Sequence, residues 1–432
     1  MLDVAYIREH LDEVKTNCTN RKVEADVDAV IALDDERREL VKQTQALQQR
    51  ANEVSKKTKG EKDAEKRQAL IEEGRSLKQQ IGELEKQQKA ATEKRDEVLC
   101  LIPNVTHPDA PVGTTDEDNK VIDKWGEPRQ FDFEVKDHVA IGEALDLVDF
   151  DAGSSVAGQK FYFLKNEAVL LEIALIQYAM QLLVKKGFTP IITPDLARAE
   201  VLDGVGYIPR GPETQIYSIE NSDLCLIATA EITLGGMHRD KIFAEKELPL
   251  KYVGLSHCFR TEAGAPGRDA KGLYRVHQFT KVEMFAFCKP DQSDEIHEEL
   301  RAIEEEIFQG LELPYQVIDT YTGDLGGPAH RKSHLEAWMP GRGDGGEYGE
   351  VTSTSNCTDY QARRLKIRYR PGGEKKGTQF VHTLNGTAVA VSRALVAILE
   401  NNQQADGSVT IPEALRPWIG KDAIPARSTS KK

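Results

Sequence analysis

Arginines and carboxylates lie close to Phe279 between residues 259 and 287, in the stretch FRTEAGAPGRDAKGLYRVHQFTKVEMFAF. Its apolar ends and glycine-rich centre predict two strands joined by a loop. Arg260 and Glu262 are two residues apart, so we expect them on one face of the first strand. The same alternation on the second strand runs through Arg275, His277, Phe279, Lys281 and Glu283. So much charge does not suit the buried face of a structural sheet, whereas it suits a ligand with phosphates, a flat ring and an amine.

This stretch resembles motif 2 of the class II aminoacyl-tRNA synthetases, in the form typical of seryl-tRNA synthetases, through FRTEAG and the following GRDAKGLYRVHQF. Other segments resemble the same family, in the family's order: GFTPIITPDL as motif 1, Thr229-Ala230-Glu231 as the serine-binding segment, EVTSTSNCTDYQARR at 350–364, and TLNGTAVAVSRALVAILE at 383–400 as motif 3. A lone Arg-x-Glu would carry no weight. Five motifs in order, over nearly the whole chain to about Trp418, make the resemblance specific.

The resemblance implies that L-serine is activated with ATP and that the seryl group is then transferred to a tRNA. Attack of the serine carboxylate on the α-phosphorus creates a transition state that needs positive charge more than an acid or a base. The implied catalytic residues are Arg260 on the α-phosphate, Glu262 on the adenine amino group, and Arg393, which covers one face of the adenine. Phe279 would stack on the other face. The implied ATP-binding residues are Arg260, Thr261, Glu262, Val276, His277, Gln278, Phe279, Glu350, Val351, Thr352, Ser353 and Arg393.

The resemblance also implies a magnesium ion and a serine pocket. Glu350 and Ser353 would hold Mg²⁺, since their oxygen atoms suit a hard cation that bridges the ATP phosphates. The implied serine-binding residues are Thr229, Ala230, Glu231, Glu283, Asn385 and Thr387. Alanine in such a pocket would leave buried partners of the hydroxyl group unpaired, and threonine must be excluded by size. No zinc is expected, because the six cysteines are scattered singly and form no ligand set.

The sequence departs from the family pattern at two places beside these motifs. It has Thr354-Ser355 where many members carry Ser-Cys, and Ser333-His334 where an aromatic residue and an acid commonly precede LEAW. Both are edge positions that leave the implied site residues intact.

From about residue 28 to residue 100 the sequence is typical of a long helical hairpin. It is dense in Lys, Glu, Gln and Arg, and it has no proline between residues 30 and 100. Apolar residues follow steps of three and four through Val30, Leu33, Leu40, Leu47, Ala51 and Val54, and again through Leu70, Leu77, Ile81, Leu84, Ala91 and Val98. KTKGEKD separates the two runs, so we expect two antiparallel helices of some thirty residues, each about 45 Å long.

The charge of this hairpin permits contact with RNA. Residues 31–100 contain 16 Lys or Arg and 15 Asp or Glu, a balance of +1, so the other residues together carry −15. On charge alone, a solvated coiled coil that binds protein or nothing is the favoured interpretation. The resemblance implies a homodimer in which the hairpin reaches across to the tRNA on the other subunit, tRNA(Ser) or, where the organism has one, tRNA(Sec). Candidate phosphate contacts are Arg37, Arg38, Lys42, Lys56, Lys57, Lys59, Arg67, Arg75 and Lys78.

Three prolines in LIPNVTHPDAPVG at 101–113 predict a domain boundary. We expect a tRNA-binding domain at 1–105, a catalytic domain at 106–420 and a disordered tail at 421–432. In the catalytic domain the pattern predicts helices at 168–184 and 291–310, extended GFTPIITPDLA, and strands at 248–254, 281–288 and 315–320. The expected fold class is therefore α+β, with a helical hairpin followed by an antiparallel sheet flanked by helices.

Composition limits the remaining functions. The formal charge is −14, so any contact with nucleic acid must be local. No run of 18 apolar residues occurs, and the N-terminus carries charges where a signal peptide needs an apolar stretch, so we expect a cytoplasmic protein with no membrane contact. One alternative is a relative that acylates a carrier protein, but such relatives lack the hairpin. Another is a binding protein with a decayed site, which would have lost Arg260, Glu262, Glu350 or Arg393.

Overall fold

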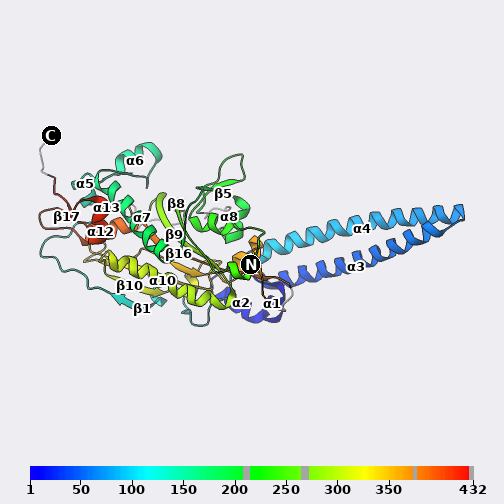
Figure 1. The fold of residues 1–432 in the computed structure, drawn as a ribbon. Coiled ribbons are helices and arrows are strands. Elements are labelled where there is room, and N and C mark those ends of the chain that lie inside the picture. Colours follow the sequence, from blue (N-terminus) through cyan, green and yellow to red (C-terminus); the bar gives the residue numbers. More distant parts are fainter. Residues whose placement is uncertain (208–214, 264–271, 373–376, 428–432) are drawn as a thin grey trace. The chain divides into compact units, whose positions relative to one another are not determined.

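The computed structural model describes all 432 residues except 208–214, 264–271, 373–376 and 428–432 (Figure 1). The chain forms two compact units, Met1–Val105 and Thr106–Lys432. Part of the predicted tail and the centre of the predicted motif 2 loop lie outside the described residues. Each unit is considered by itself.

The first unit consists of four helices, two of them very long. These are α1 (Val4–Glu9), α2 (Leu11–Asn20), α3 (Val27–Gly60) and α4 (Ala64–Leu99). Figure 1 shows α3 and α4 running antiparallel along each other, so the predicted hairpin is confirmed. Aspartates begin both arms: Asp26 accepts a hydrogen bond from the backbone of Ala29 (2.9 Å), and Asp63 accepts from Lys66 (3.2 Å). The 34 residues of α3 correspond to a length of about 50 Å.

The seam between α3 and α4 contains a buried acid that the periodicity did not indicate. Five of the twelve apolar residues predicted for the seam are buried and the other seven are half-buried; the buried ones are Val30, Leu40, Val54, Leu77 and Ala91. Asp34, however, is only 1% exposed and forms ion pairs with four guanidinium groups, those of Arg8 (3.2 Å), Arg37 (3.0 Å), Arg38 (2.8 Å) and Arg95 (3.2 Å). The arginines outweigh the cost of burial and lower the pKa of Asp34 below its usual value. Two of the candidate phosphate contacts, Arg37 and Arg38, are thus already held by this acid.

A large sheet forms the centre of the second unit. In the described part of the chain its strands follow the order β1 (Lys120–Trp125), β10 (Tyr315–Asp319), β11 (Arg331–Met339), β13 (Thr354–Asn356), β16 (His382–Ala390), β9 (Gln278–Cys288), β8 (Leu250–Phe259) and β4 (Thr189–Ile192), and β12 (Glu347–Glu350) also pairs with β11. Neighbouring strands are antiparallel except β4 and β8. The predicted antiparallel sheet is therefore confirmed, with one parallel strand at its edge.

Helices cover both faces of this sheet. Because side chains alternate along β9, Val282 and Met284 join one core cluster and Phe285 and Phe287 join the other. The first cluster includes residues of α7 (Glu167–Lys185), α10 (Ser293–Gly310) and α12 (Val391–Asn401). The second includes residues of α8 (Ala199–Val205), α9 (Ala230–Gly236) and α11 (Tyr360–Leu365). The predicted helices at 168–184 and 291–310 are confirmed as α7 and α10.

Short elements complete the second unit. The helices are α5 (His138–Ala144), α6 (Phe150–Ala157) and α13 (Arg416–Ile419). The strands are β15 (Gln379–Phe380), β14 (Arg368–Arg370) and β7 (Ile242–Ala244) in one small sheet, and the pairs β2 (Val148–Asp149) with β3 (Phe163–Leu164), β5 (Leu196–Arg198) with β6 (Leu224–Leu226), and β17 (Val409–Thr410) with β18 (Ala423–Ile424). Among the described residues, α7 alone is long and apolar enough to cross a membrane, a test that core helices of soluble proteins also pass.

Candidate active site

A cavity of about 570 Å³ lies on the face of the sheet that carries Phe279 and Glu283. We call it the β9 cavity. Most of the residues implied by the motifs line it: Glu231, Arg260, Glu262, Val276, Phe279, Glu283, Glu350, Val351, Thr352, Ser353, Asn385, Thr387 and Arg393. Thr229, Ala230, Thr261, His277 and Gln278 are not among its lining residues. Segments far apart in the sequence, from β9, β12, β16, α9 and α12, thus supply one polar surface.

The two strands of the motif 2 region end earlier than the alternation predicted. Strand β8 ends at Phe259, opposite Gln278 of β9, so Arg260 and Glu262 follow the first strand and do not share a strand face. The backbone leaves the extended conformation because Glu262 has a positive φ of 52°. One further backbone hydrogen bond joins Arg260 N to the oxygen of His277 (3.0 Å), and His277 Nδ1 lies 2.8 Å from the oxygen of Arg260. His277 therefore supports the corner from outside the cavity.

Positive charge and aromatic rings lie side by side at this corner. The guanidinium carbon of Arg260 is 5.3 Å from the centre of the Phe279 ring. Glu262 accepts a hydrogen bond from Arg275 Nη1 at 3.2 Å. A flat, electron-rich ligand lying on Phe279 would therefore have a fixed cation beside it and a carboxylate within the same corner.

Arg393 of α12 lies on a tyrosine that the sequence analysis did not single out. Its guanidinium carbon is 4.8 Å from the ring centre of Tyr274, and that of Arg342 is 4.2 Å from the same ring. Arg393 Nη1 donates to the backbone oxygen of Glu350 (3.0 Å) and lies 3.5 Å from the carboxylate oxygen Oε1 of the same residue. The Tyr274 hydroxyl donates to that backbone oxygen too (3.1 Å). Tyr274 thus holds Arg393 at the edge of the cavity, beside Glu350.

Glu350 is strongly ionised. Burial opposes its charge, but Arg393 and Lys332 outweigh burial and lower the pKa of Glu350 to about 2. The backbone oxygen of Ser353, three residues on, accepts a hydrogen bond from Thr387 N (2.9 Å) and so is tied to β16. A permanently charged carboxylate with a serine nearby fits a hard cation such as Mg²⁺ that also takes phosphate oxygens. No group of three or more His, Cys, Asp or Glu suited to hold a metal by itself is present in the described ranges.

A second group of acids lies at the β9–β16 end of the cavity. Glu283 pairs with Lys281 Nζ (2.5 Å) and accepts a weak hydrogen bond from the Thr387 hydroxyl (3.5 Å). Glu231, from α9, accepts a hydrogen bond from Asn385 Nδ2 (3.0 Å). Burial, together with the charge of Glu283, raises the pKa of Glu231 to about 7. This part of the cavity therefore offers one acid paired with a lysine and one acid that forms no ion pair with any of the described residues, an arrangement suited to an incoming ammonium group.

The remaining predicted residues support the site from behind. Thr229 begins α9 and accepts a hydrogen bond from the Glu231 backbone (3.2 Å), so the Thr-Ala-Glu segment is the first turn of a helix. Gln278 pairs with Phe259 at the start of β9. At Ser333-His334, one of the two departures from the family pattern, His334 is buried between the hydroxyl of Thr320 (3.1 Å) and the carboxylate of Glu336 (3.2 Å).

Sequence reasoning missed several cavity residues. Tyr207, Lys332 and the loop 324–329 line the cavity, and no spacing in the sequence connects them with motif 2. Tyr274 and Arg275 fall inside the stretch that resembles motif 2. The alternation of residues along a strand could not predict that Tyr274 lies between Arg342 and Arg393, which come from other parts of the sequence. Gln361 falls inside the recognised segment 350–364 but does not line the cavity. Its position in the sequence gives no indication of the residues that it contacts.

Comparisons with known proteins give the class of this fold and site. Residues 215–402 match the family model described as the tRNA synthetase class II core domain (G, H, P, S and T), and residues 1–106 match the seryl-tRNA synthetase N-terminal domain. The core with its β9 cavity is thus that of a class II aminoacyl-tRNA synthetase.

Individual relatives narrow this class. The chain is 58% identical to a serine–tRNA ligase of Rubrobacter xylanophilus, over 99% of this chain and 100% of the relative, and 56% identical to one of Treponema denticola, over 98% and 100%. A seryl-tRNA synthetase structure from Pyrococcus horikoshii complexed with ATP is similar with a TM-score of 0.91 and 42% identity, over 99% of this chain and all of that one. A Naegleria fowleri cytoplasmic serine–tRNA ligase in complex with AMP gives a TM-score of 0.86 at 34% identity, over 99% of both chains. The chain belongs to the seryl-tRNA synthetase family.

Proposed function

We propose that this protein activates L-serine with ATP to seryl-adenylate and transfers the seryl group to tRNA(Ser). One observation supports the proposal most: a single cavity has an arginine on an aromatic ring at one end and two acids beside a threonine hydroxyl at the other. A nucleotide and a small amino acid can therefore meet inside it. The names of the relatives, and the ATP in one similar structure, agree with this assignment.

The positively charged groups account for the activation step. As the serine carboxylate attacks the α-phosphorus and pyrophosphate leaves, negative charge gathers on the phosphate oxygens. Arg260 would stabilise that charge, and Phe279 would stack under the adenine. Arg393 of α12, which contacts the Tyr274 ring in this structure, would cover the other face of the adenine. Transfer to the tRNA hydroxyl needs no side-chain nucleophile, because the adenylate is already activated.

The acids account for selection of serine. Glu231 would bind the ammonium group, and Glu283 with Thr387 would bind the hydroxyl group. A buried site built to hydrogen-bond a hydroxyl discriminates strongly against alanine, since its partners would be left unpaired. Glu350 and Ser353 would hold Mg²⁺, which supplies charge neutralisation on the ATP phosphates when bound.

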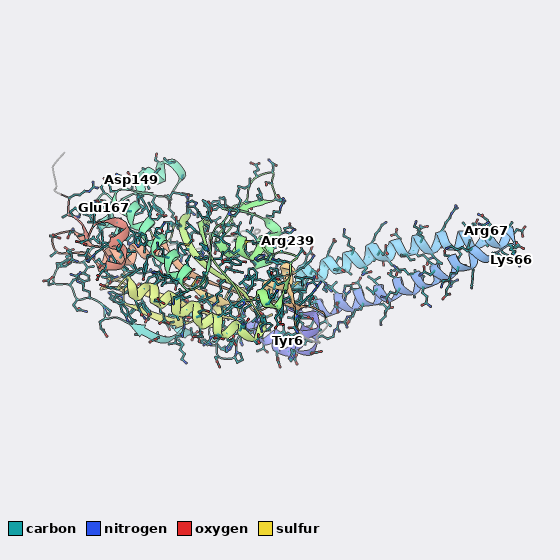
Figure 2. All side chains as sticks on the ribbon, in the orientation of Figure 1. Tyr6, Lys66, Arg67, Asp149, Glu167 and Arg239 are labelled. Carbon is teal, nitrogen blue, oxygen red and sulfur yellow. The ribbon has the colours of Figure 1, made fainter. Side chains whose placement is uncertain are left out.

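The hairpin is the proposed tRNA-binding element of a domain at 1–105, with the catalytic domain at 106–420. Figure 2 shows Lys66 and Arg67 at the end of the hairpin where α3 and α4 meet, well away from the short helices α1 and α2 of the same unit. Long basic side chains on a narrow rod can contact RNA phosphates by shape and charge, without reading bases. The same mode would serve tRNA(Sec), which is therefore a second proposed acceptor.

A homodimer is proposed from the outer surface of α7 and β4. Although α7 buries one side in the core, Val169, Leu170 and Ile173 are exposed on the other, and Ile192 of the edge strand β4 is 81% exposed. Apolar side chains gathered on one helix and one sheet edge are typical of a protein interface. A second copy of this chain is the proposed occupant, in the cytoplasm, where the six cysteines, none of them in a disulfide bond, would stay reduced.

Charging assays test this function directly. Purified protein with ATP and radiolabelled serine should acylate a tRNA(Ser) transcript and, under the same conditions, a tRNA(Sec) transcript, while a tRNA with a short variable arm stays uncharged. Failure to charge tRNA(Ser) would refute the proposed function, and failure with tRNA(Sec) alone would remove only the second acceptor.

A further inference from the structure

Gln361 is a fully buried glutamine directly behind Glu231. It lies on α11, between the strand β16 and the end of α8, with 0% of its surface exposed. Its Nε2 donates to Glu231 Oε1 (2.7 Å) and to the backbone oxygen of Val205 (2.9 Å). Its Oε1 accepts from the Thr383 hydroxyl (2.7 Å). All three partners come from other elements, so one amide joins α9, α8 and β16.

These contacts fix the direction of the amide. The nitrogen faces two acceptors, a carboxylate oxygen and a backbone oxygen, so the reversed amide would place its own oxygen against both of them. Burial makes that reversal costly, because no water is available to replace the lost partners. The Nε2 hydrogen aimed at Glu231 is therefore a permanent feature of the pocket.

Both amide donors to Glu231 converge on the same oxygen. Gln361 Nε2 and Asn385 Nδ2 (3.0 Å) each bind Oε1. A carboxylate can accept hydrogen bonds at both of its oxygens. Because both amides bind Oε1, neither of them occupies Oε2. The two amides thus hold the carboxylate by Oε1, and the hydroxyl of Tyr207 is a further hydrogen-bond partner of Glu231.

We propose that Gln361 is a positioning residue of the serine site: its amide anchors Oε1 of Glu231 so that the carboxylate is held in the orientation that binds the ammonium group of serine. The assignment rests on the proposed function. It goes beyond the motif residues, because Gln361 touches no substrate and acts through Glu231.

The charges around Glu231 show why this anchor matters. Burial and the nearby Glu283 on β9 both favour the protonated, neutral acid, whereas Lys281 on β9, the hydroxyl of Tyr207 and the amide of Gln361 favour the carboxylate. Among these, Gln361 and Tyr207 act by hydrogen bonding. Losing the Gln361 donor would leave Glu231 both less ionised at neutral pH and less firmly oriented.

The same residue steadies a second wall of the cavity. Val205 precedes Gly206 and Tyr207, which both line the cavity. Because Gln361 binds the Val205 oxygen, the ammonium-binding acid and this wall share one buried support. If Gln361 positions Glu231, its replacement should raise KM for serine and leave KM for ATP unchanged. If its role is only structural, its replacement should destabilise the protein and affect KM for serine and KM for ATP alike.

The test compares Gln361→Met with the matched control Gln403→Met in the full-length protein. Gln403 is also buried and also uses both ends of its amide, bonding the backbone nitrogen and oxygen of Lys136 (both 2.9 Å), but it lines no part of the β9 cavity. Pyrophosphate exchange is measured against serine and against ATP from pH 6 to pH 9, with a thermal melt for each protein. A third variant, Thr383→Val, removes the hydroxyl that orients the Gln361 amide at little cost in shape.

We expect Gln361→Met to raise KM for serine by about tenfold or more while KM for ATP stays within about twofold, since a hydrogen bond to a charged group is lost. The acid limb of kcat/KM for serine should move to higher pH. Thr383→Val should shift KM for serine and the acid limb in the same direction by less, and Gln403→Met should shift neither.

An unchanged KM for serine in Gln361→Met, or an equal rise of KM for serine and KM for ATP, would overturn the inference. If Gln361→Met does not fold, an unchanged KM for serine in Thr383→Val would overturn it. Absence of serine-dependent exchange in the unmodified protein is a different result, which refutes the proposed function itself.

Discussion

Acidification from pH 8 to pH 6 should weaken serine binding selectively. The reason is Glu231, whose pKa of about 7 results from its burial and from the neighbouring charge of Glu283. Only the ionised carboxylate attracts an ammonium group. The sign follows directly: protons and serine compete for the same group, so the affinity for serine falls as pH falls through 7.

The size of the effect follows from the titration. With a pKa near 7, Glu231 is ionised in roughly ten of eleven molecules at pH 8 and in roughly one of eleven at pH 6. If the neutral acid binds serine poorly, KM for serine should be about tenfold higher at pH 6 than at pH 8. Serine itself keeps its ammonium charge over this range, and Glu350, with a pKa of about 2, stays ionised throughout.

Pyrophosphate exchange at saturating Mg-ATP measures this dependence, with KM for ATP recorded at each pH as the internal control. Glu231→Gln is the matched variant, because it keeps the shape of the side chain but cannot titrate, so its KM for serine should be high and independent of pH. A wild-type KM for serine that does not change between pH 6 and pH 8, or that begins to rise only near pH 4.5, would refute the explanation.

Other predictions concern the hairpin, its seam and the dimer surface. Replacing residues 56–62 and the adjoining turn by a short linker should leave serine-dependent exchange nearly intact and abolish acylation of tRNA(Ser); equal loss of both activities would contradict the proposed division of labour. Asp34→Ala should lower the free energy of unfolding by about 3 kcal/mol, because it leaves four arginines without their buried partner, and circular dichroism in urea at low salt measures the change, with the exposed Asp35→Ala as control. Ile173→Asp should convert a dimer into a monomer in sedimentation experiments, and an unchanged mass would show that the outer face of α7 is not the interface.

The hairpin and the strands at 248–254, 281–288 and 315–320 could be predicted because they follow from local patterns, whereas the order of the strands in the sheet could not. Steps of three and four residues specify a helix face, and the turn between the arms is marked by a glycine among charges. Asp34 could not be predicted as buried, because its stability depends on Arg8 and Arg95, which reach it from separate helices. Periodicity assigns faces within one element and carries no information on which charges meet between elements.

The candidate site shows the same limit at finer scale. Alternation correctly placed Phe279 and Glu283 on one face of β9, because that strand is regular. It failed for Arg260 and Glu262, because the chain leaves the sheet there through a residue with positive φ. Gln361 could not be found from its spacing at all, since its three partners belong to three other elements.

The most direct test of the account is pyrophosphate exchange with each of the twenty amino acids, without tRNA, for the unmodified protein and for Arg260→Ala. The account predicts exchange with serine alone and a loss of at least about a hundredfold in the variant, since Arg260 supplies the charge that the transition state requires. Exchange with another amino acid, or with none, would contradict the assignment of the β9 cavity as a serine-activating site.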